Sequence, residues 1–359
     1  MKKSLLALAV LGSFAGAASA QTNVTIYGVV DAGVSVNNGG NAAGKKIGLD
    51  SGGQSGSRIG FKGTEDLGGG LAAIFTLENG FNVDDGTLSA TTDATSRLFG
   101  RQAWVGLAGG LGAVKFGRQQ TALYSSLSAI DPFGISLSGD AQKMFGGGLY
   151  KQDPLSRTDN TVSFSTANFN GFSASASYGL GEAAGKTSQG SNVGVGVQYV
   201  NGPVNVQFAY QDSSDVTLGS AGFVNAKTAG FGTATSDIKT AFIGGTYDFG
   251  VAKAHLAYAD TKVEQAGFAD QKDRNWLVGV SAPVGAAGTV LASYVANDVT
   301  DRADAKSDQY ALGYTHSLSK RTNLYTSVSY LKNDSNVALN TYANGESVRK
   351  FNVGVRHAF

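Results

Sequence analysis

Alternation of apolar and polar residues, the pattern of a β-strand, begins at Val24 and recurs along most of the chain. In VTIYGVVD, the first such stretch, Ile26 falls on one parity and Asp31 on the other. The same alternation is clear at 172–178 and 204–211. Because successive side chains of a strand point to opposite faces, these stretches predict strands with one apolar and one polar face.

Two kinds of connection alternate between the strands. Short turns occur at positions such as 109–112 and 201–202, whereas longer polar stretches include 37–54 and 297–306. Short turns at one end and long loops at the other are typical of outer-membrane barrels. We count 16 strands, at about 21 residues per strand with its connection. This predicts an all-β fold, a 16-stranded antiparallel transmembrane β-barrel.

The connection at 122–156 runs for 35 residues without strand alternation. A loop of this size in a compact domain is usually functional or disordered. Apolar residues within it favour an ordered loop: Leu123, Leu127, Ile130, Pro132, Phe133, Met144 and Phe145. We therefore predict that this long third loop folds into the lumen and sets the width of a pore.

The first 20 residues have the order of a secretory signal peptide: Lys2 and Lys3, an apolar run, and small residues ending at Ala20. Cleavage there leaves a single barrel domain at 21–359 with 26 basic and 27 acidic residues, a balance that does not favour nucleic acid. The chain has no cysteine, so a disulfide scaffold is excluded. No later apolar run reaches the roughly 18 residues of a spanning helix, which excludes a helical membrane protein.

The C-terminal residues have the pattern of a closing strand. Phe351, Val355 and Phe359 share the apolar parity, while Lys350 and Arg356 share the other. Pairing of this strand with the first one would leave no unpaired edge in lipid.

Several motifs, spread in order over the whole mature chain, carry a more specific resemblance. They are VTIYGVVDAG at Val24, SRIGFKGTEDLGGGL at Ser57, GLGAVKFGRQ at Gly110, APVG at Ala282, LSKRT at Leu318 and the terminal VGVRHAF. With them the chain resembles the Gram-negative general porins of the beta-proteobacterial type. The resemblance implies a homotrimer of water-filled diffusion channels in outer-membrane lipid. It also implies that Phe359 is a signal read by the barrel-assembly machinery.

Several cations are predicted to face the lumen. In SRIGFKG the apolar Ile59 and Phe61 take the lipid parity. Arg58 and Lys62 therefore point inward, about 13 Å apart at 3.3 Å per residue.

The apolar parity of the segment 162–164 likewise assigns Arg157 and Asp159 to the lumen. The pattern does not orient Arg101, whose parity partners are apolar, and Arg118 is a nearby cation of equally open orientation. The resemblance implies that three arginines form a basic cluster on the wall at the constriction: Arg58, Arg101 and Arg157.

Two acidic residues of the loop are candidates for the opposite side of the constriction. Asp131 precedes Pro132 and Phe133, where the resemblance implies an acidic residue, and Asp140 is a second candidate. The acidic stretch at 298–308 lacks the spacing of a calcium loop. We therefore predict no metal site, no cofactor and no catalytic residue.

The leading hypothesis is a passive pore for small hydrophilic solutes and ions with a modest anion preference, because 16 strands leave an aqueous channel. A solute-selective channel is an alternative, and its expected signature is an aromatic track inside the lumen. A barrel enzyme would need a Ser/His or Asp/His constellation at the rim. An adhesin or structural anchor would not need the inward loop.

Overall fold

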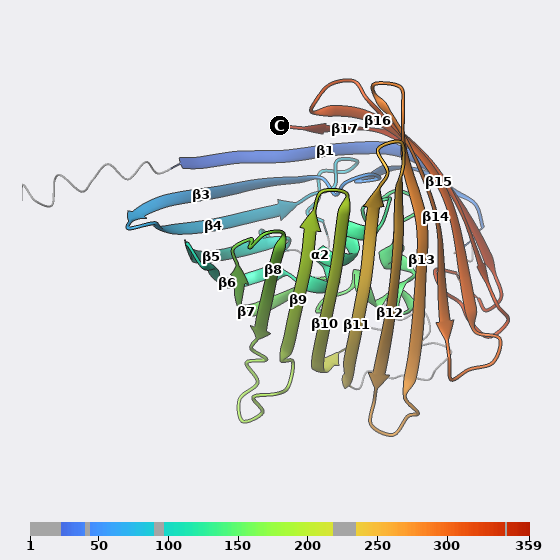
Figure 1. The fold of residues 1–359 in the computed structure, drawn as a ribbon. Helices are drawn as coiled ribbons and strands as arrows, with labels where there is room; N and C mark the ends of the chain where they lie inside the picture. The colour runs from blue at the N-terminus through green and yellow to red at the C-terminus, as the bar shows by residue number, and fades with distance from the viewer. Residues whose placement is uncertain (1–22, 40–43, 90–96, 218–234, 342) are drawn as a thin grey trace, which may run out of the picture.

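The computed structural model describes residues 23–39, 44–89, 97–217, 235–341 and 343–359, which form one closed β-barrel with a helical loop inside it (Figure 1). The signal peptide predicted at 1–20 lies outside the described residues. No helix in the described part of the chain has the length and apolar character needed to cross a bilayer.

Every neighbouring pair of strands in the described barrel is antiparallel. The strands are β1 Asn23–Asn38, β2 Lys46–Ser51, β3 Arg58–Gly68, β4 Leu71–Gly80, β5 Gln102–Gly109, β6 Gly112–Gln120, β7 Arg157–Thr166, β8 Phe172–Gly179, β9 Asn192–Asn201, β10 Val204–Thr217, β11 Thr235–Asp248, β12 Lys253–Glu264, β13 Gln271–Val284, β14 Gly288–Val299, β15 Lys306–Ser317, β16 Thr322–Asn333 and β17 Ser347–Ala358.

β2 and β3 are two parts of one barrel strand. β2 pairs with residues 32–37 of β1, and β3 pairs with residues 23–29 of the same strand. The 17 strand segments therefore form a barrel of 16 strands, which confirms the predicted fold. The polar loop predicted at 37–54 is wrong in its second half, because KIGLDS pairs with β1 although its alternation is too short to stand out.

The barrel closes between its first and last strands, as predicted. β1 pairs with β17, and Gly28 and Phe359 exchange two backbone hydrogen bonds of 3.1 Å. The Phe359 ring lies so close to Gly28 that a Cβ at this position would overlap it. A glycine is therefore required where the chain end packs on the first strand.

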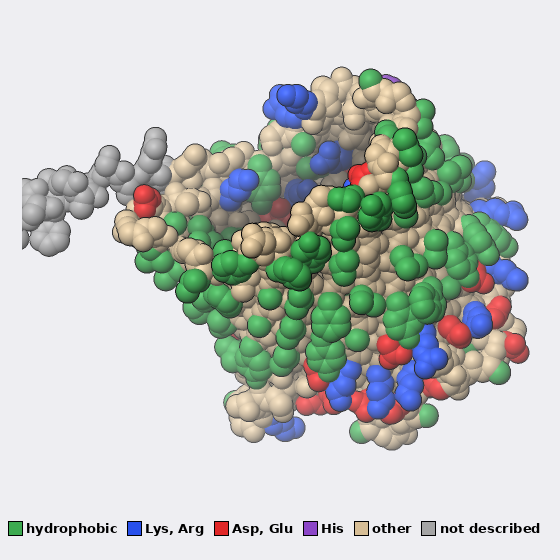
Figure 2. Space-filling view, in the orientation of Figure 1, with side chains coloured by type: hydrophobic (Ala, Val, Ile, Leu, Met, Phe, Trp, Pro, Cys, Tyr) green, Lys and Arg blue, Asp and Glu red, His purple; other side chains and the backbone are tan. Residues whose placement is uncertain are grey.

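The outer surface is divided into an apolar band and a charged rim, as Figure 2 shows. Aromatic rings pair on the outer surface, with the centroids of Tyr258 and Trp276 4.5 Å apart. Ion pairs such as Lys239 with Glu264, 3.0 Å apart, lie toward the end with the longer connections. An apolar band bordered by aromatic and charged side chains matches the cross-section of a lipid bilayer.

The connection between β6 and β7 folds into the barrel. It contains α2 (Ala122–Ile130) and two 3-10 helices, η1 (Ala141–Lys143) and η2 (Phe145–Lys151). α2 starts at Thr121, whose Oγ1 accepts a 3.0 Å hydrogen bond from the backbone N–H of Tyr124. Such a cap satisfies one of the free N–H groups of the first helical turn.

The loop is fixed to one wall by a buried apolar core. Leu127 of α2 and Phe145 of η2 pack in one cluster with the inward-facing Phe242 and Leu277, and the helices contact β9 to β14. Where the loop covers them, the inner faces of β10 to β14 carry apolar side chains of this core beside polar ones, so the uniformly polar inner face expected from the alternation is wrong at this wall. The loop consequently leaves open space toward the opposite wall, formed by β3 to β7.

Candidate functional site: the pore constriction

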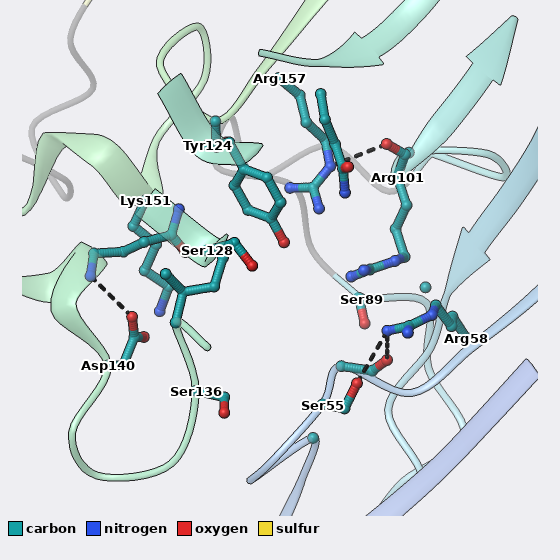
Figure 3. Close-up of a pocket in the computed structure, with 18 of the residues that line it drawn as sticks. Ser55, Arg58, Ser89, Arg101, Tyr124, Ser128, Ser136, Asp140, Lys151 and Arg157 are labelled. Carbon is teal, nitrogen blue, oxygen red and sulfur yellow. Dashed lines mark hydrogen bonds between the residues drawn. The ribbon is translucent and has the colours of Figure 1, made fainter. Parts of the chain in front are cut away.

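A cavity of about 650 Å³ separates the inward loop from the opposite wall. Figure 3 shows Arg58, Arg101 and Arg157 on the wall side and Asp140 and Lys151 on the loop side. Seven described basic residues line the cavity: Arg58, Arg97, Arg101, Arg118, Lys143, Lys151 and Arg157. Three acidic residues accompany them: Glu78, Asp140 and Asp153. The lining is therefore positive by four formal charges.

Glu78 of β4 lies between two of the wall arginines. Its carboxylate is 2.7 Å from Arg101 Nε and 3.7 Å from Arg58 Nε, and its side chain is 6% exposed. It also accepts a 2.9 Å hydrogen bond from the Tyr27 hydroxyl. One buried carboxylate thus fixes two guanidiniums and neutralises the charge of only one.

Arg157, the first residue of β7, is held by neutral groups. Its Nε donates a 3.0 Å hydrogen bond to the backbone carbonyl of Arg101, and its guanidinium lies 5.1 Å from the centroid of the Tyr124 ring. Among the described residues, no carboxylate forms an ion pair with it. Tyr124 comes from α2, so the loop itself helps to place this cation.

Arg101 points into the cavity although its parity partners face lipid. The reason is local, because β5 begins one residue later, at Gln102. The backbone N–H of Arg101 still donates to the Glu78 carbonyl, over 3.2 Å, but the residue lies in a bend. Strand parity therefore does not apply to it.

The other predicted lumen residues take different places. Arg118 lines the cavity but is 8% exposed, and it binds Asp153 at 2.5 Å and Asp159 at 2.8 Å. Asp159 does not line the cavity and pairs with Arg97 as well, at 2.6 Å. Lys62 lies outside the cavity, with its ammonium 5.3 Å from the centroid of the Tyr27 ring.

Of the two acidic candidates in the loop, Asp140 lines the cavity and Asp131 does not. Asp131 is buried, and its carboxylate accepts hydrogen bonds from the backbone N–H groups of Phe133, Ile135 and Ala141, at 3.0, 2.9 and 3.2 Å. It organises the loop tip and does not line the cavity. Asp140 does line it, paired with Lys143 at 3.1 Å.

The sequence of the chain matches the Gram-negative porin family over residues 7–336. The chain belongs to this family. It is 37% identical over 373 residues to outer membrane porin protein 32 of Delftia acidovorans, with all of both chains covered. It is 36% identical over 409 residues to an outer membrane porin protein of Bordetella pertussis, again with full coverage.

Among solved structures, the anion-selective porin from Comamonas acidovorans superposes with a TM-score of 0.79 at 33% identity, covering 94% of this chain and 100% of that one. The porin described here is accordingly a protein of the Gram-negative outer membrane, and a passive channel rather than an enzyme.

Sequence reasoning missed Glu78 and the loop residues Tyr124 and Lys151. A signal for Glu78 exists, because Glu78 and Thr76 share one parity of β4 while Phe75 and Leu77 share the other. The loop residues carried no comparable signal, since their orientation depends on how α2 and η2 pack. The nearby positive charge of Lys143 lowers the pKa of Lys151.

One Ser/His contact does occur in the porin, but it has a structural role. His255 Nδ1 lies 2.6 Å from the carbonyl oxygen of Ile130, and its Nε2 lies 3.0 Å from Ser281 Oγ. Ile130 ends α2, so His255 ties the helix to β12. No group of three potential metal ligands occurs within the described ranges.

Replacing Asp131 with Asn is expected to change the pH dependence of the porin's thermal stability. Burial raises the pKa of the Asp131 carboxyl to about 7. Because folding favours the protonated carboxyl, Asp131 adds stability that is fully present below its unfolded pKa of about 3.9. This stability, on the order of 4 kcal/mol, is lost as the pH rises through about 7.

Melting temperatures of both chains at about pH 4 and about pH 8 measure this effect. Wild type should lose more stability than Asp131→Asn between the two pH values. Other carboxylates titrate in both proteins, so the difference between the two losses reports Asp131. An identical pH dependence would contradict the role assigned to Asp131.

Proposed function

We propose that this porin is a general diffusion channel for small hydrophilic solutes and ions, with a modest preference for anions. The observation that carries the proposal is the charge of the constriction, positive by four in a mature chain whose 26 basic and 27 acidic residues almost balance. The positive field is therefore local to the narrow part of the pore.

Three physical factors set the size of the preference. Guanidiniums stay charged at any working pH. In a narrow passage their charges act at an effective dielectric well below that of bulk water. Salt weakens the effect, because the Debye length falls from about 10 Å at 0.1 M to about 3 Å at 1 M. The preference should therefore be clear in dilute KCl and small in concentrated KCl.

A solute-selective channel is the competing proposal. It requires a track of aromatic side chains, but Tyr124 is the one aromatic residue among the described residues that line the cavity, and Arg157 lies over its ring. A lining without an aromatic track supports passage of solutes without tight binding.

Swelling of liposomes that contain the refolded porin tests the passive mechanism. Rates for neutral sugars should fall smoothly with molecular size and rise in proportion to concentration, because no binding step limits them. Saturation for one sugar, with slow passage of others of the same size, would favour the solute-selective channel.

We also infer that the mature chain begins at residue 21 after signal cleavage and assembles in outer-membrane lipid as a homotrimer, with the barrel-assembly machinery as a partner. One solved outer-membrane protein of the same fold, from Vibrio cholerae, is described as a trimer form. An unheated SDS gel of the refolded porin should show an oligomer, and a strictly monomeric band would contradict the inference.

A further inference from the structure

We propose that Asp31 and Tyr325 are positioning residues for the constriction: they hold the turn at 52–57, and this turn places both the wall arginines and the tip of the inward loop. The inference rests on the proposed channel function. Neither residue lines the cavity. Their effect on ion preference is therefore exerted through the turn.

Tyr325 points inward from β16 into a slot between three glycines. A Cβ at Gly33, Gly53 or Gly354 would overlap its hydroxyl oxygen. The residue is 2% exposed, and its hydroxyl donates a 2.6 Å hydrogen bond to Asp31 Oδ1. The slot thus brings β1, β17 and the turn into direct contact with one side chain.

Asp31 binds the backbone of the turn. Its Oδ2 accepts hydrogen bonds from the backbone N–H groups of Gln54 and Ser55, at 2.9 and 2.6 Å. Its own carbonyl accepts one from the N–H of Gly52 at 2.9 Å. The turn separates β2 from β3, so these hydrogen bonds replace the pairing that a continuous strand would make with β1.

The turn at 52–57 also holds two of the wall arginines, Arg58 and Arg101. Ser55 Oγ and the Gly56 carbonyl accept hydrogen bonds from Arg58 Nη1, at 3.2 and 3.0 Å, and Figure 3 shows Ser55 beside Arg58. Gly56 also lies against Arg101, because a Cβ there would be 3.0 Å from its Nη1. A shift of the turn would therefore move both guanidiniums.

The same turn binds the inward loop. The Gly53 carbonyl accepts a 2.8 Å hydrogen bond from the N–H of Leu137. Leu137 and Phe133 of the loop tip belong to one buried cluster with Tyr325. The Asp31–Tyr325 pair thus fixes the position of both the wall side and the loop side of the constriction.

Tyr325→Phe tests the proposal, since it removes the hydroxyl and keeps the ring. Loss of a hydrogen bond to a carboxylate is expected to raise the population of the released turn about tenfold or more. The zero-current potential in a KCl gradient should move toward zero, and the open-channel current noise should rise. Tyr294→Phe is the matched control, because its hydroxyl binds Asp308 at 2.7 Å on the outer face of the barrel.

Identical potentials and noise for Tyr325→Phe and Tyr294→Phe would overturn the positioning role. Absence of anion preference in the wild type, recorded alongside, would instead overturn the proposed function. If Tyr325→Phe does not refold, Ser55→Ala leaves the slot intact and removes the hydroxyl beside Arg58. It should shift the potential in the same direction by a smaller amount, and no shift would overturn the link between turn and arginine.

Discussion

Replacing Arg58, Arg101 and Arg157 together with Gln is expected to move the zero-current potential in a KCl gradient toward cation preference. The change lowers the formal charge of the lining from four positive to one positive. Two unit charges 4 Å apart interact by about 1 kcal/mol even in bulk water, and more strongly in a confined passage. Since 1.4 kcal/mol is a factor of ten, the ratio of anion to cation permeability should fall about tenfold.

The control removes three cations from the outer rim instead. Lys239, Lys262 and Arg274 all form ion pairs on the outer surface, away from the cavity. Their replacement by Gln should leave the potential close to that of the wild type. Asp140→Asn should move it toward stronger anion preference. If the triple arginine variant keeps the wild-type potential, these arginines do not determine the preference.

Loss of the wall arginines also leaves Glu78 buried without its charged partners. Breaking a buried ion pair in this way costs about 3–5 kcal/mol. A second variant therefore adds Glu78→Gln to the three substitutions, so that a folding defect and a change in selectivity are distinguished. It should show a smaller shift in the same direction, because the lining keeps two net positive charges.

Deleting Phe359, or changing it to Ser, is expected to reduce outer-membrane assembly strongly while the refolded barrel remains conductive. The deletion removes the two backbone hydrogen bonds that close the seam with Gly28. Both changes remove an exposed ring from the apolar outer surface, where it is 46% exposed. The constriction is unaffected, since Phe359 does not line it.

Phe249→Ser is the matched control for this experiment. Phe249 is also an exposed outer aromatic, with its ring centroid 4.7 Å from that of Tyr247, but it lies between β11 and β12 and not at the terminus. Immunoblots of outer-membrane fractions should show near-normal amounts of this variant and little of the Phe359 variants. Equal amounts of both would show that the terminal position has no special role.

The fold could be predicted from the sequence because a lipid-spanning strand must present one apolar face. That constraint gave the strand number, the closing strand and the inward direction of Arg58 and Arg157, both of which line the cavity. It did not reveal β2, which is short. It also did not indicate that the inner faces of β10 to β14 carry apolar core residues, since those faces are covered by a loop distant in sequence.

The candidate site was harder to predict wherever a residue lies outside a strand. Arg101 precedes β5, so its direction follows from a bend and a hydrogen bond to the carbonyl of Glu78. Asp131 carries the charge expected of a pore residue, yet three backbone N–H groups of the same loop hold it inside the loop. Both outcomes depend on backbone geometry that alternation does not encode.

Single-channel recording of the wild-type porin in a planar bilayer, with dilute KCl on one side and more concentrated KCl on the other, tests the central claim most directly. The account predicts stepwise, ohmic currents whose zero-current potential has the sign of chloride preference and shrinks as the salt concentration is raised. A zero-current potential with the sign of potassium preference, in a channel that still conducts in steps, would contradict it.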